Sequence, residues 1–326
     1  MSILKKSGPR NVKSIADFCC STLLSLVAFE MTVFAPYVPQ EFNKMTTFQL
    51  PTNDVVFKLL FSKPENSDLL ISFLTAVLKP ARPIQSVQIL NPELPKDTAV
   101  NKTIILDVMA KLSDGSKIDV EMQVDDRKNL RKRIPFYLAR LHQSQLEPGD
   151  AYHKITPTVS IVILAYNETP EENFHTIYEL REQKSHLLFS DDLKIHLIEL
   201  LKVSDFLKKH ASAQTQDVIF WTRFFNSKTQ SELDILAMEK PIFEKANQAL
   251  RAISNDPETL EVIRLRELGR INFNTAMYGA REEGREEGRE EGQRKIVLTM
   301  HSKGMTSDQI ATLLDLELAE VEEFLG

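Results

Sequence analysis

The sequence has little cysteine: two residues in 326, Cys19 and Cys20, which are adjacent. One adjacent pair cannot supply the framework of a disulfide-rich secreted fold, so a reducing compartment is favoured. The seven histidines are scattered, and none pair at the spacing of a zinc site. No glycine-rich loop follows a predicted strand, which excludes the phosphate-binding loops used for ATP or NAD.

The sequence also lacks an excess of positive charge, with 40 basic residues against 46 acidic ones. The net charge of −6 at pH 7 argues against attraction of the whole surface to nucleic acid, but it allows a local basic patch. A hydrophobic content of 42% over 326 residues supports a packed core in one large domain or two modest ones.

The first 44 residues read differently from the rest. Basic residues precede an apolar run from Ala16 to Val33, as in a secretory signal, but Asp17 and Glu30 interrupt it and no clear cleavage site follows. The run is also too short and too charged for a membrane span. Because Met45 begins a stretch typical of a soluble domain, we interpret residues 1–44 as a leader or an upstream extension. We therefore expect a cytoplasmic protein without a membrane partner; a secreted or membrane protein would rest on the leader alone.

Hydrophobic periodicity predicts an α/β domain over residues 45–235, with the order helix, three strands, helix, strand. The predicted helices cover residues 53–61, 67–78 and 125–145, and the predicted strands cover 85–90, 103–112, 117–124 and 158–166. Weaker signals predict strands over 175–180 and 193–201 and helices over 218–225, 241–254 and 258–277.

The remaining residues predict a helical extension over 236–302 and a two-helix tail over 303–326. The extension contains the repeat AREEGREEGREEGQRK, at 280–295. Its glycines cost a helix about 1 kcal/mol each relative to alanine, so we interpret it as a solvated helical spacer. In the tail, Thr306 and Gln309 match a capping box. The second tail helix is acidic and would repel DNA phosphates, which favours contact with protein and allows a homo-oligomer.

Two acids interrupt a predicted hairpin that is otherwise apolar. Asp107 and Glu121 lie in the segments on either side of the turn Ser113-Asp114-Gly115. A two-residue loop would pair Asp107 with Met122 and point the acids to opposite faces. A three-residue loop, with Gly115 in the left-handed conformation, would place Asp107 directly across from Glu121.

In the second register the facing acids need a positive charge between them, and a divalent cation such as Mg²⁺ would supply it. Asp119 and Gln123 would lie on the same face as Glu121, while Ile118, Val120 and Met122 would face the core. Paired acids can also be merely solvated, so the spacing alone does not establish a metal site.

A basic run, RKNLRKR, follows the hairpin and opens the next predicted helix. Beside a metal site, cations of this kind would hold a nucleic-acid backbone. A basic run is more often a solvated helix face. The candidate DNA-binding residues are Arg127, Lys128, Arg131, Lys132, Arg133, Tyr137 and Arg140.

Four short segments carry a resemblance: NDVVFK at 53–58, LDV at 106–108, VEMQ at 120–123 and RIPFY at 133–137. In this order they resemble the PD-(D/E)XK nuclease superfamily, and within it the Rpn family of recombination-promoting nucleases, often labelled transposases. The resemblance covers roughly residues 53–166. It implies a restriction-endonuclease-like αβββαβ core and DNA cleavage that depends on Mg²⁺ or another divalent cation.

The resemblance also implies site residues. Asp107 matches the metal-binding acid, Glu121 the second acid, and Gln123 the position where the superfamily more commonly has lysine. Glutamine can orient a water but carries no charge, and Lys102 or Lys111 would have to replace the missing cation. Asp54 and Lys58 match the opening signature, and Asp54 is either a third metal ligand or only a helix cap.

Two functions follow from these residues. The first is a Mg²⁺-dependent DNA endonuclease linked to recombination or mobile elements, with Asp107, Glu121 and Gln123 as catalytic residues and Asp107, Glu121 and Asp54 as metal ligands. The alternative is a catalytically decayed DNA-binding or scaffold protein that assembles through its helical tail.

Overall fold

The structure is a computed structural model that describes residues 48–90, 93–94, 104–125 and 129–326. The proposed leader over residues 1–44, the two candidate DNA-binding residues Arg127 and Lys128, and Lys102 lie outside the described residues.

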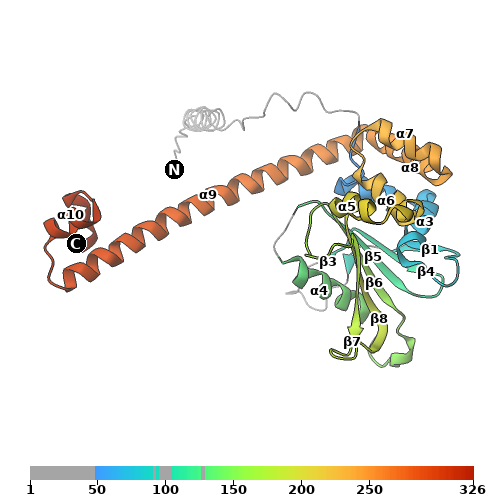
Figure 1. Ribbon diagram of the computed structural model, residues 1–326, viewed down its shortest axis with the longest axis horizontal. Helices are drawn as coiled ribbons and strands as arrows, with labels where there is room; N and C mark the ends of the chain where they lie inside the picture. The colour runs from blue at the N-terminus through green and yellow to red at the C-terminus, as the bar shows by residue number, and fades with distance from the viewer. Residues whose placement is uncertain (1–47, 91–92, 95–103, 126–128) are drawn as a thin grey trace, which may run out of the picture. The chain divides into compact units, whose positions relative to one another are not determined.

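The described chain contains one six-stranded sheet, a separate two-stranded pair and a series of helices (Figure 1). The strands are β1 Val87–Leu90, β2 Glu93–Leu94, β3 Ile104–Ile105, β4 Val108–Leu112, β5 Lys117–Gln123, β6 Thr158–Leu164, β7 His175–Arg181 and β8 Leu188–Glu199. The α-helices are α2 Asp54–Ser62, α3 Ser67–Leu78, α4 Leu130–Gln143, α5 Val203–Lys209, α6 Asp217–Asn226, α7 Gln230–Glu239, α8 Pro241–Ser254, α9 Pro257–Ser302, α10 Ser307–Leu314 and α11 Leu318–Leu325.

The six-stranded sheet has the order β1-β4-β5-β6-β8-β7, so β5 is an interior strand. The central strands β5, β6 and β8 run parallel, and the outer pairs are antiparallel. This α/β arrangement confirms the restriction-endonuclease-like fold that the resemblance implies. The two weakly predicted strands are also confirmed, as β7 and β8.

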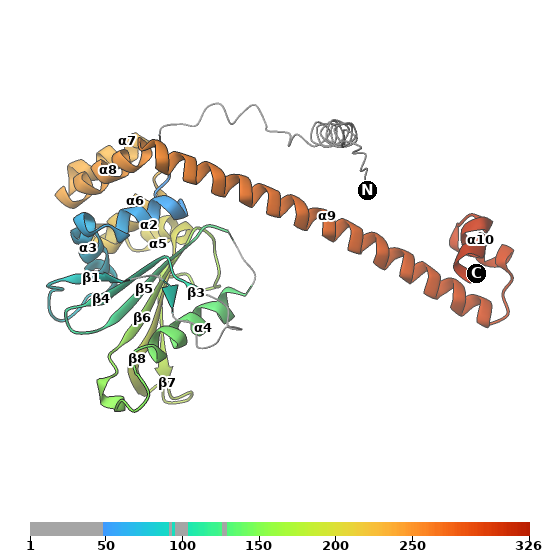
Figure 2. The same ribbon diagram turned by 180° about the vertical axis from the view of Figure 1, so that it is seen from behind.

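The two faces of the sheet are covered differently (Figures 1 and 2). On one face, Ile118, Val120 and Met122 of β5 join the main core with α2, α3, α6 and α8. On the other face, Leu130 and Ile134 of α4 pack against β6 and β8. Because side chains alternate along a strand, the polar residues of β5 lie on the α4 face.

The main core is aromatic at its centre and continues beyond the proposed domain boundary. Trp221 packs against Phe73 with ring centroids 5.6 Å apart, and both are almost fully buried. The core cluster extends through Phe243 of α8 to Ile263 of α9. Residue 235, where the sequence analysis ends the nuclease-like domain, falls within α7.

The hairpin between β4 and β5 adopts the three-residue loop. The Leu112 amide donates to the Ser116 carbonyl at 2.9 Å, and the Gly115 amide donates to the Leu112 carbonyl at 3.0 Å. Gly115 has φ +94°, the left-handed region that glycine adopts without a steric penalty. The register pairs Val108 with Val120, which confirms the second of the two predicted alternatives.

Three predicted elements differ from the observed ones. The strand predicted over 103–112 is interrupted between β3 and β4, at Leu106 and Asp107. The helix predicted from residue 125 begins at Leu130, because Asn129 has φ +86° and a left-handed residue cannot continue a right-handed helix backwards. The predicted helix over 258–277 and the repeat form one continuous helix, α9.

The tail forms a small cluster at the end of α9. Thr306 and Gln309 make both hydrogen bonds of the predicted capping box at the start of α10. Val297 of α9, Ile310 of α10 and Val321 of α11 are buried against one another. None of the helices in the described part of the chain is long and apolar enough to cross a membrane.

Replacing Gly115 with alanine should lower the free energy of unfolding by about 2–3 kcal/mol. A left-handed conformation costs an L-residue about 1–2 kcal/mol, and a Cβ at Gly115 would also lie 2.9 Å from Thr156 Cγ2. Thr156 is held in place, because its hydroxyl donates to the Gly115 carbonyl at 2.8 Å. Urea denaturation measures the loss.

Gly149→Ala is the matched control, because Gly149 has φ +95° but nothing within 4 Å of the added Cβ. It should lose only about 1–2 kcal/mol. Equal losses in the two variants would show that the Thr156 contact contributes nothing to the turn.

Candidate active site

Asp107 and Glu121 face each other where β4 begins. Continuing the hairpin register by one residue places them opposite each other. The Asp107 amide donates to Glu121 Oε1 at 3.1 Å, and the Met122 amide donates to Asp107 Oδ2 at 3.0 Å. The two side chains thus take hydrogen bonds that backbone carbonyls would otherwise accept, which accounts for the break in the strand at Asp107.

Lys58 supplies a cation beside these acids. Its Nζ lies 3.1 Å from Asp107 Oδ1, and the two side chains are 26% and 14% exposed. Lys58 extends from α2, a helix far from the hairpin in sequence. In the sequence, Lys58 stands out only as part of the opening signature, and it was not predicted as a site residue.

Lys111, which the sequence analysis considered for this role, lies elsewhere. It is paired with Lys117 beside the hairpin turn, four residues along β4 from Asp107. At about 3.3 Å per residue, that separation is roughly 13 Å. Lys58 is therefore the better placed of these two lysines to act beside the acids.

Asp54 makes other contacts. Asn53 is the N-cap of α2, and its side chain accepts hydrogen bonds from the amides of Val55 and Val56. Asp54 Oδ2 forms an ion pair with Arg266 of α9. Within the described residues, no hydrogen bond or ion pair joins Asp54 to Asp107 or Glu121, so the structure does not bring this candidate ligand into the acidic pair.

Asp119 adds a third acid to the same face of β5. It is 1% exposed; Oδ2 accepts a hydrogen bond from the Ser160 hydroxyl at 3.0 Å, while Oδ1 is buried without a partner. Burial raises the pKa of Asp119 to about 7; Ser160 opposes this shift and the charge of Asp107 adds to it. The signal for Ser160 was a polar residue within the apolar run TVSIVILAY.

Burial and neighbouring charges disfavour the ionised form of Glu121. It is 4% exposed. Burial raises its pKa well above the usual value, and the charges of Asp119 and Asp107 raise it further. The Asp107 amide and Arg133 oppose that shift without cancelling it. The ionised form of Glu121 therefore needs more positive charge than these residues provide.

Gln123 connects this acid to α4. Its Nε2 donates to Glu121 Oε2 at 3.2 Å, and its Oε1 accepts a hydrogen bond from Arg133 Nη2. The Arg133 guanidinium lies 5.9 Å from the centre of the Tyr137 ring. Burial raises the pKa of Tyr137, Arg133 lowers it, and the charges of all three acids raise it. Of the candidate DNA-binding residues, Arg133 and Tyr137 thus lie close to the acids.

The donor set fits a hard divalent cation. Mg²⁺ is bound in proteins by one or two carboxylates and keeps several waters, and Asp107 and Glu121 supply two facing carboxylates. The buried Oδ1 of Asp119 has no hydrogen-bond partner, so it remains available as an acceptor. In the described part of the chain, no group of three or more His, Cys, Asp or Glu side chains is arranged to hold a metal ion, so water or substrate oxygens would have to complete the coordination around Asp107 and Glu121.

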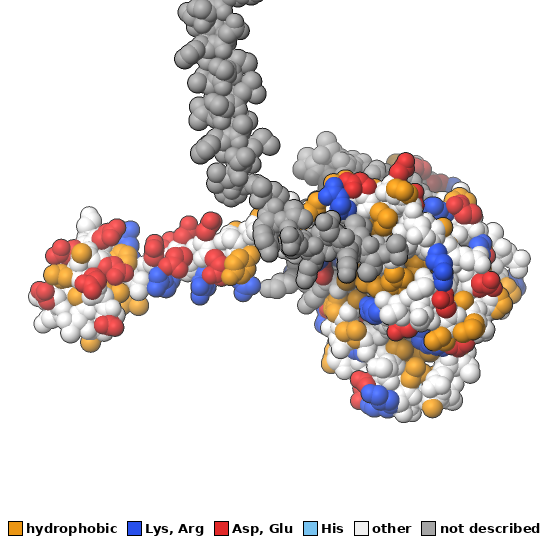
Figure 3. Space-filling model, turned by 90° about the horizontal axis from the view of Figure 1, so that it is seen from above, with side chains coloured by type: hydrophobic (Ala, Val, Ile, Leu, Met, Phe, Trp, Pro, Cys, Tyr) orange, Lys and Arg blue, Asp and Glu red, His pale blue; other side chains and the backbone are white. Residues whose placement is uncertain are grey.

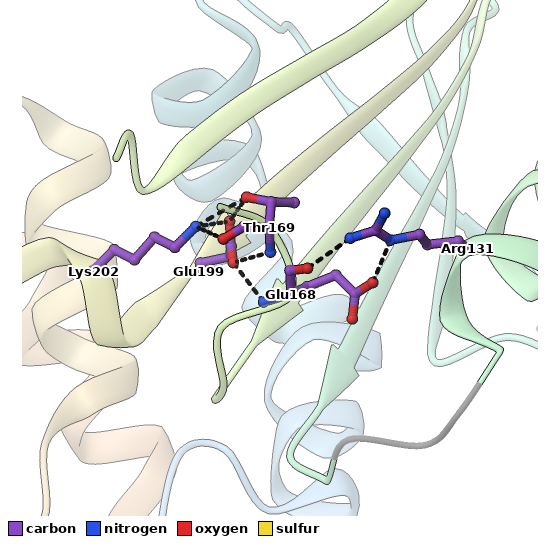
Figure 4. Close-up of polar contacts among 5 residues, drawn as sticks. All are labelled: Arg131, Glu168, Thr169, Glu199 and Lys202. Carbon is purple, nitrogen blue, oxygen red and sulfur yellow. Dashed lines mark hydrogen bonds and ion pairs between the residues drawn. The ribbon is translucent and has the colours of Figure 1, made fainter. Parts of the chain in front are cut away.

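The other basic residues of α4 point in different directions. Arg131 donates to Glu168, from Nε to Oε1 at 2.6 Å and from Nη2 to the carbonyl at 2.8 Å (Figure 4). Lys132 is exposed and Arg140 is half-buried. The candidate DNA-binding residues therefore do not form one cluster: Arg133 and Tyr137 lie near the acids, whereas Arg131 holds the loop after β6.

That loop is anchored by Glu199, at the end of β8, which the sequence analysis did not single out. Its side chain is fully buried and accepts four hydrogen bonds, from the Glu168 and Thr169 amides, the Thr169 hydroxyl and Lys202 Nζ, at 2.6–3.0 Å (Figure 4). Burial raises the pKa of Glu199, but these donors outweigh it and leave the pKa below its usual value. Glu199 thus fixes the loop that in turn holds Arg131 and the first turn of α4.

Comparison with known proteins identifies the family of the chain. Residues 51–275, which include all three acids and Lys58, match the family described as PD-(D/E)XK nuclease family transposase. No curated protein and no solved structure matches the chain significantly. Because the family match covers more than half of the sequence, the chain belongs to the PD-(D/E)XK nuclease family of transposases.

Proposed function

We propose that the protein is a metal-dependent DNA endonuclease that hydrolyses phosphodiester bonds and acts in recombination or in mobile elements. The observation that carries this proposal is the facing pair of carboxylates, Asp107 and Glu121, with Lys58 Nζ 3.1 Å from Asp107. A cation-binding pair beside a fixed ammonium is suited to a reaction that builds negative charge on a phosphate.

Asp107 and Glu121 would hold Mg²⁺ or another divalent cation, which when bound supplies an activated water and neutralises phosphate charge. Lys58 would donate hydrogen bonds to the scissile phosphate or to the attacking water, taking the role for which the superfamily more commonly uses lysine at position 123. Gln123 would orient Glu121 through its amide, and Arg133 holds Gln123 in turn. Asp54 would be at most an outer ligand of the cation. To take this role it would first have to break its ion pair with Arg266.

DNA is the proposed partner, and α4 is the proposed contact surface. Lys132 is exposed, Arg133 and Tyr137 lie near the acids, and Arg140 follows them along the helix. Arg127, Lys128 and Arg131 precede or open α4 and would add phosphate contacts, which position DNA without reading its sequence. We also propose that the protein acts in the cytoplasm, that the nuclease-like domain predicted over residues 45–235 continues through α8 into the start of α9, as its core does, and that the C-terminal helices allow self-association.

One observation favours a second function. Gln123 replaces the charged residue common at this position of the superfamily, so a DNA-binding or scaffold protein with a decayed site is the alternative. The position of Lys58 favours the nuclease, because it restores a cation beside the acids. DNA retention without turnover by the purified protein would favour the decayed site.

Neutralising either facing acid should abolish Mg²⁺-dependent nicking of supercoiled plasmid DNA. Asp107→Asn and Glu121→Gln keep the size of each side chain but remove the charge that would bind the cation, so we expect losses of at least about 10³-fold. EDTA should stop the wild-type reaction. Asp205→Asn, which removes an exposed acid paired with Lys208, is the control and should cleave normally. Undiminished cleavage by both site variants would refute the proposed nuclease site.

Lys58→Met should lower kcat by about 10²-fold or more, because it removes the cation from the site while keeping an unbranched side chain. Lys58→Arg should retain part of the activity. Lys111→Met is the matched control, since Lys111 is exposed beside the hairpin turn, and it should cleave at the wild-type rate. Equal rates for Lys58→Met and Lys111→Met would assign the catalytic cation to another residue.

Lys132→Gln should weaken binding to DNA of any sequence and reduce the slope of log K against log salt by about 1, the effect of losing one phosphate contact. Fluorescence anisotropy over a salt series measures the slope. Lys208→Gln, an exposed lysine on α5, is the control. An unchanged slope in Lys132→Gln would remove this residue from the DNA interface, whichever of the two functions holds.

A further inference from the structure

The repeat in α9 carries a line of small residues that advances four residues at a time and turns by about 40° round the helix at each step. All its members are exposed, and its three glycines stay within about 80° of one another. The members are Ala280, Gly284, Gly288 and Gly292. A Cβ added to any of these three glycines would meet nothing within 4 Å. No contact within the described chain therefore accounts for glycine at these positions, although glycine weakens a helix.

Charged residues form a row on each side of this line. A helix turns by about 100° per residue, so the residue after each glycine lies on one flank and the residue before it lies on the other. One flank is basic and the other acidic, and Figure 3 shows basic side chains gathered along one side of this part of α9 and acidic ones along another. The basic row is Arg281, Arg285 and Arg289, and the acidic row is Glu283, Glu287 and Glu291.

The acidic row is not neutralised within the chain. Arg285 pairs with Glu282 at 2.9 Å, and Arg289 pairs with Glu286. Both of these glutamates lie on the far side of the helix from the glycines. In contrast, no ion pair within the described residues involves the acidic row. The face that includes the glycines therefore presents unpaired negative charge on one flank and positive charge on the other.

We propose that this face of α9 binds the same face of a second copy of the chain, with the two helices parallel. Two parallel helices related by a twofold axis bring opposite flanks together, so the basic row of each copy meets the acidic row of the other on both sides of the contact. An antiparallel pair would bring like rows together, basic against basic and acidic against acidic. Flanking charges set helix orientation in coiled coils by the same rule.

The line of glycines fits a close crossing of two helices. Residues four apart form the ridges that interlock when helices cross at about −50°, and small residues at this spacing allow the two backbones to approach. The three glycines span eight residues, or about 12 Å of helix, and Gly288 is at the centre of this span.

This inference makes the proposed self-association specific, and it does not depend on nuclease activity. A parallel pair places the two starts of α9 at the same end of the assembly. The two chains would then present their candidate active sites from one end, an arrangement suited to acting on the two strands of one DNA duplex.

The first experiment tests the contact face by sedimentation equilibrium of the full chain. The wild type should dimerise, and Gly288→Leu should raise the dimer dissociation constant at least tenfold by filling the crossing point. Leucine is a better helix former than glycine, so the loss cannot come from unfolding of α9. Glu290→Leu adds the same side chain on the opposite face and should still dimerise. A monomeric wild type, or equal association of both variants, would overturn the proposal.

The second experiment tests orientation by cross-linking. In a chain with Cys19 and Cys20 replaced by serine, Gly284→Cys and Gly292→Cys are made separately, because the two positions lie equally far on either side of Gly288 and within the proposed crossing. A short bismaleimide should join each variant to itself, doubling the 37.2 kDa chain. A dimer that cross-links only when the two variants are mixed would be antiparallel and would overturn the proposed orientation.

Discussion

The structure depends on holding three acids close together on one face of a hairpin. Asp107, Glu121 and Asp119 repel one another, and Asp119 and Glu121 are almost fully buried. Two backbone amides, the Ser160 hydroxyl and the Lys58 ammonium offset part of this repulsion. Burial, together with the charges of Asp119 and Asp107, still raises the pKa of Glu121. A buried cluster of acids with perturbed pKa values is typical of a functional site. Here it would favour the binding of a divalent cation.

The sheet makes this cluster possible because β5 has two different faces. Ile118, Val120 and Met122 pack into the main core and fix the strand, so the polar residues between them have no freedom to turn away. The turn at Gly115 then sets the partner strand in register. A slip of one residue would send Asp107 to the opposite face. The core and one glycine thus position the site together, although neither takes part in it.

Two series of hydrogen bonds connect the candidate site to α4. Arg133 holds Gln123, and Gln123 holds Glu121. Glu199 holds the loop whose Glu168 binds Arg131. Both series of contacts include a residue of α4. Arg131 fixes the first turn of the helix, and Arg133 fixes the helix beside the acids. Of the described cations in the basic segment, Arg131 and Arg133 hold neighbouring side chains, whereas Lys132 is exposed to solvent.

The sequence by itself determined the fold class, most of the strands, the alternation along β5 and the acids Asp107 and Glu121, because these depend on local periodicity and short motifs. It left the hairpin register open, since an Asp-Gly turn allows two loop lengths of similar ease. It could not find Lys58 beside Asp107, the break in the strand at Asp107 or the anchoring role of Glu199. Those features join residues that are distant in the chain, and only the packing of α2, the loop after β6 and α4 around the sheet brings them within hydrogen-bonding distance.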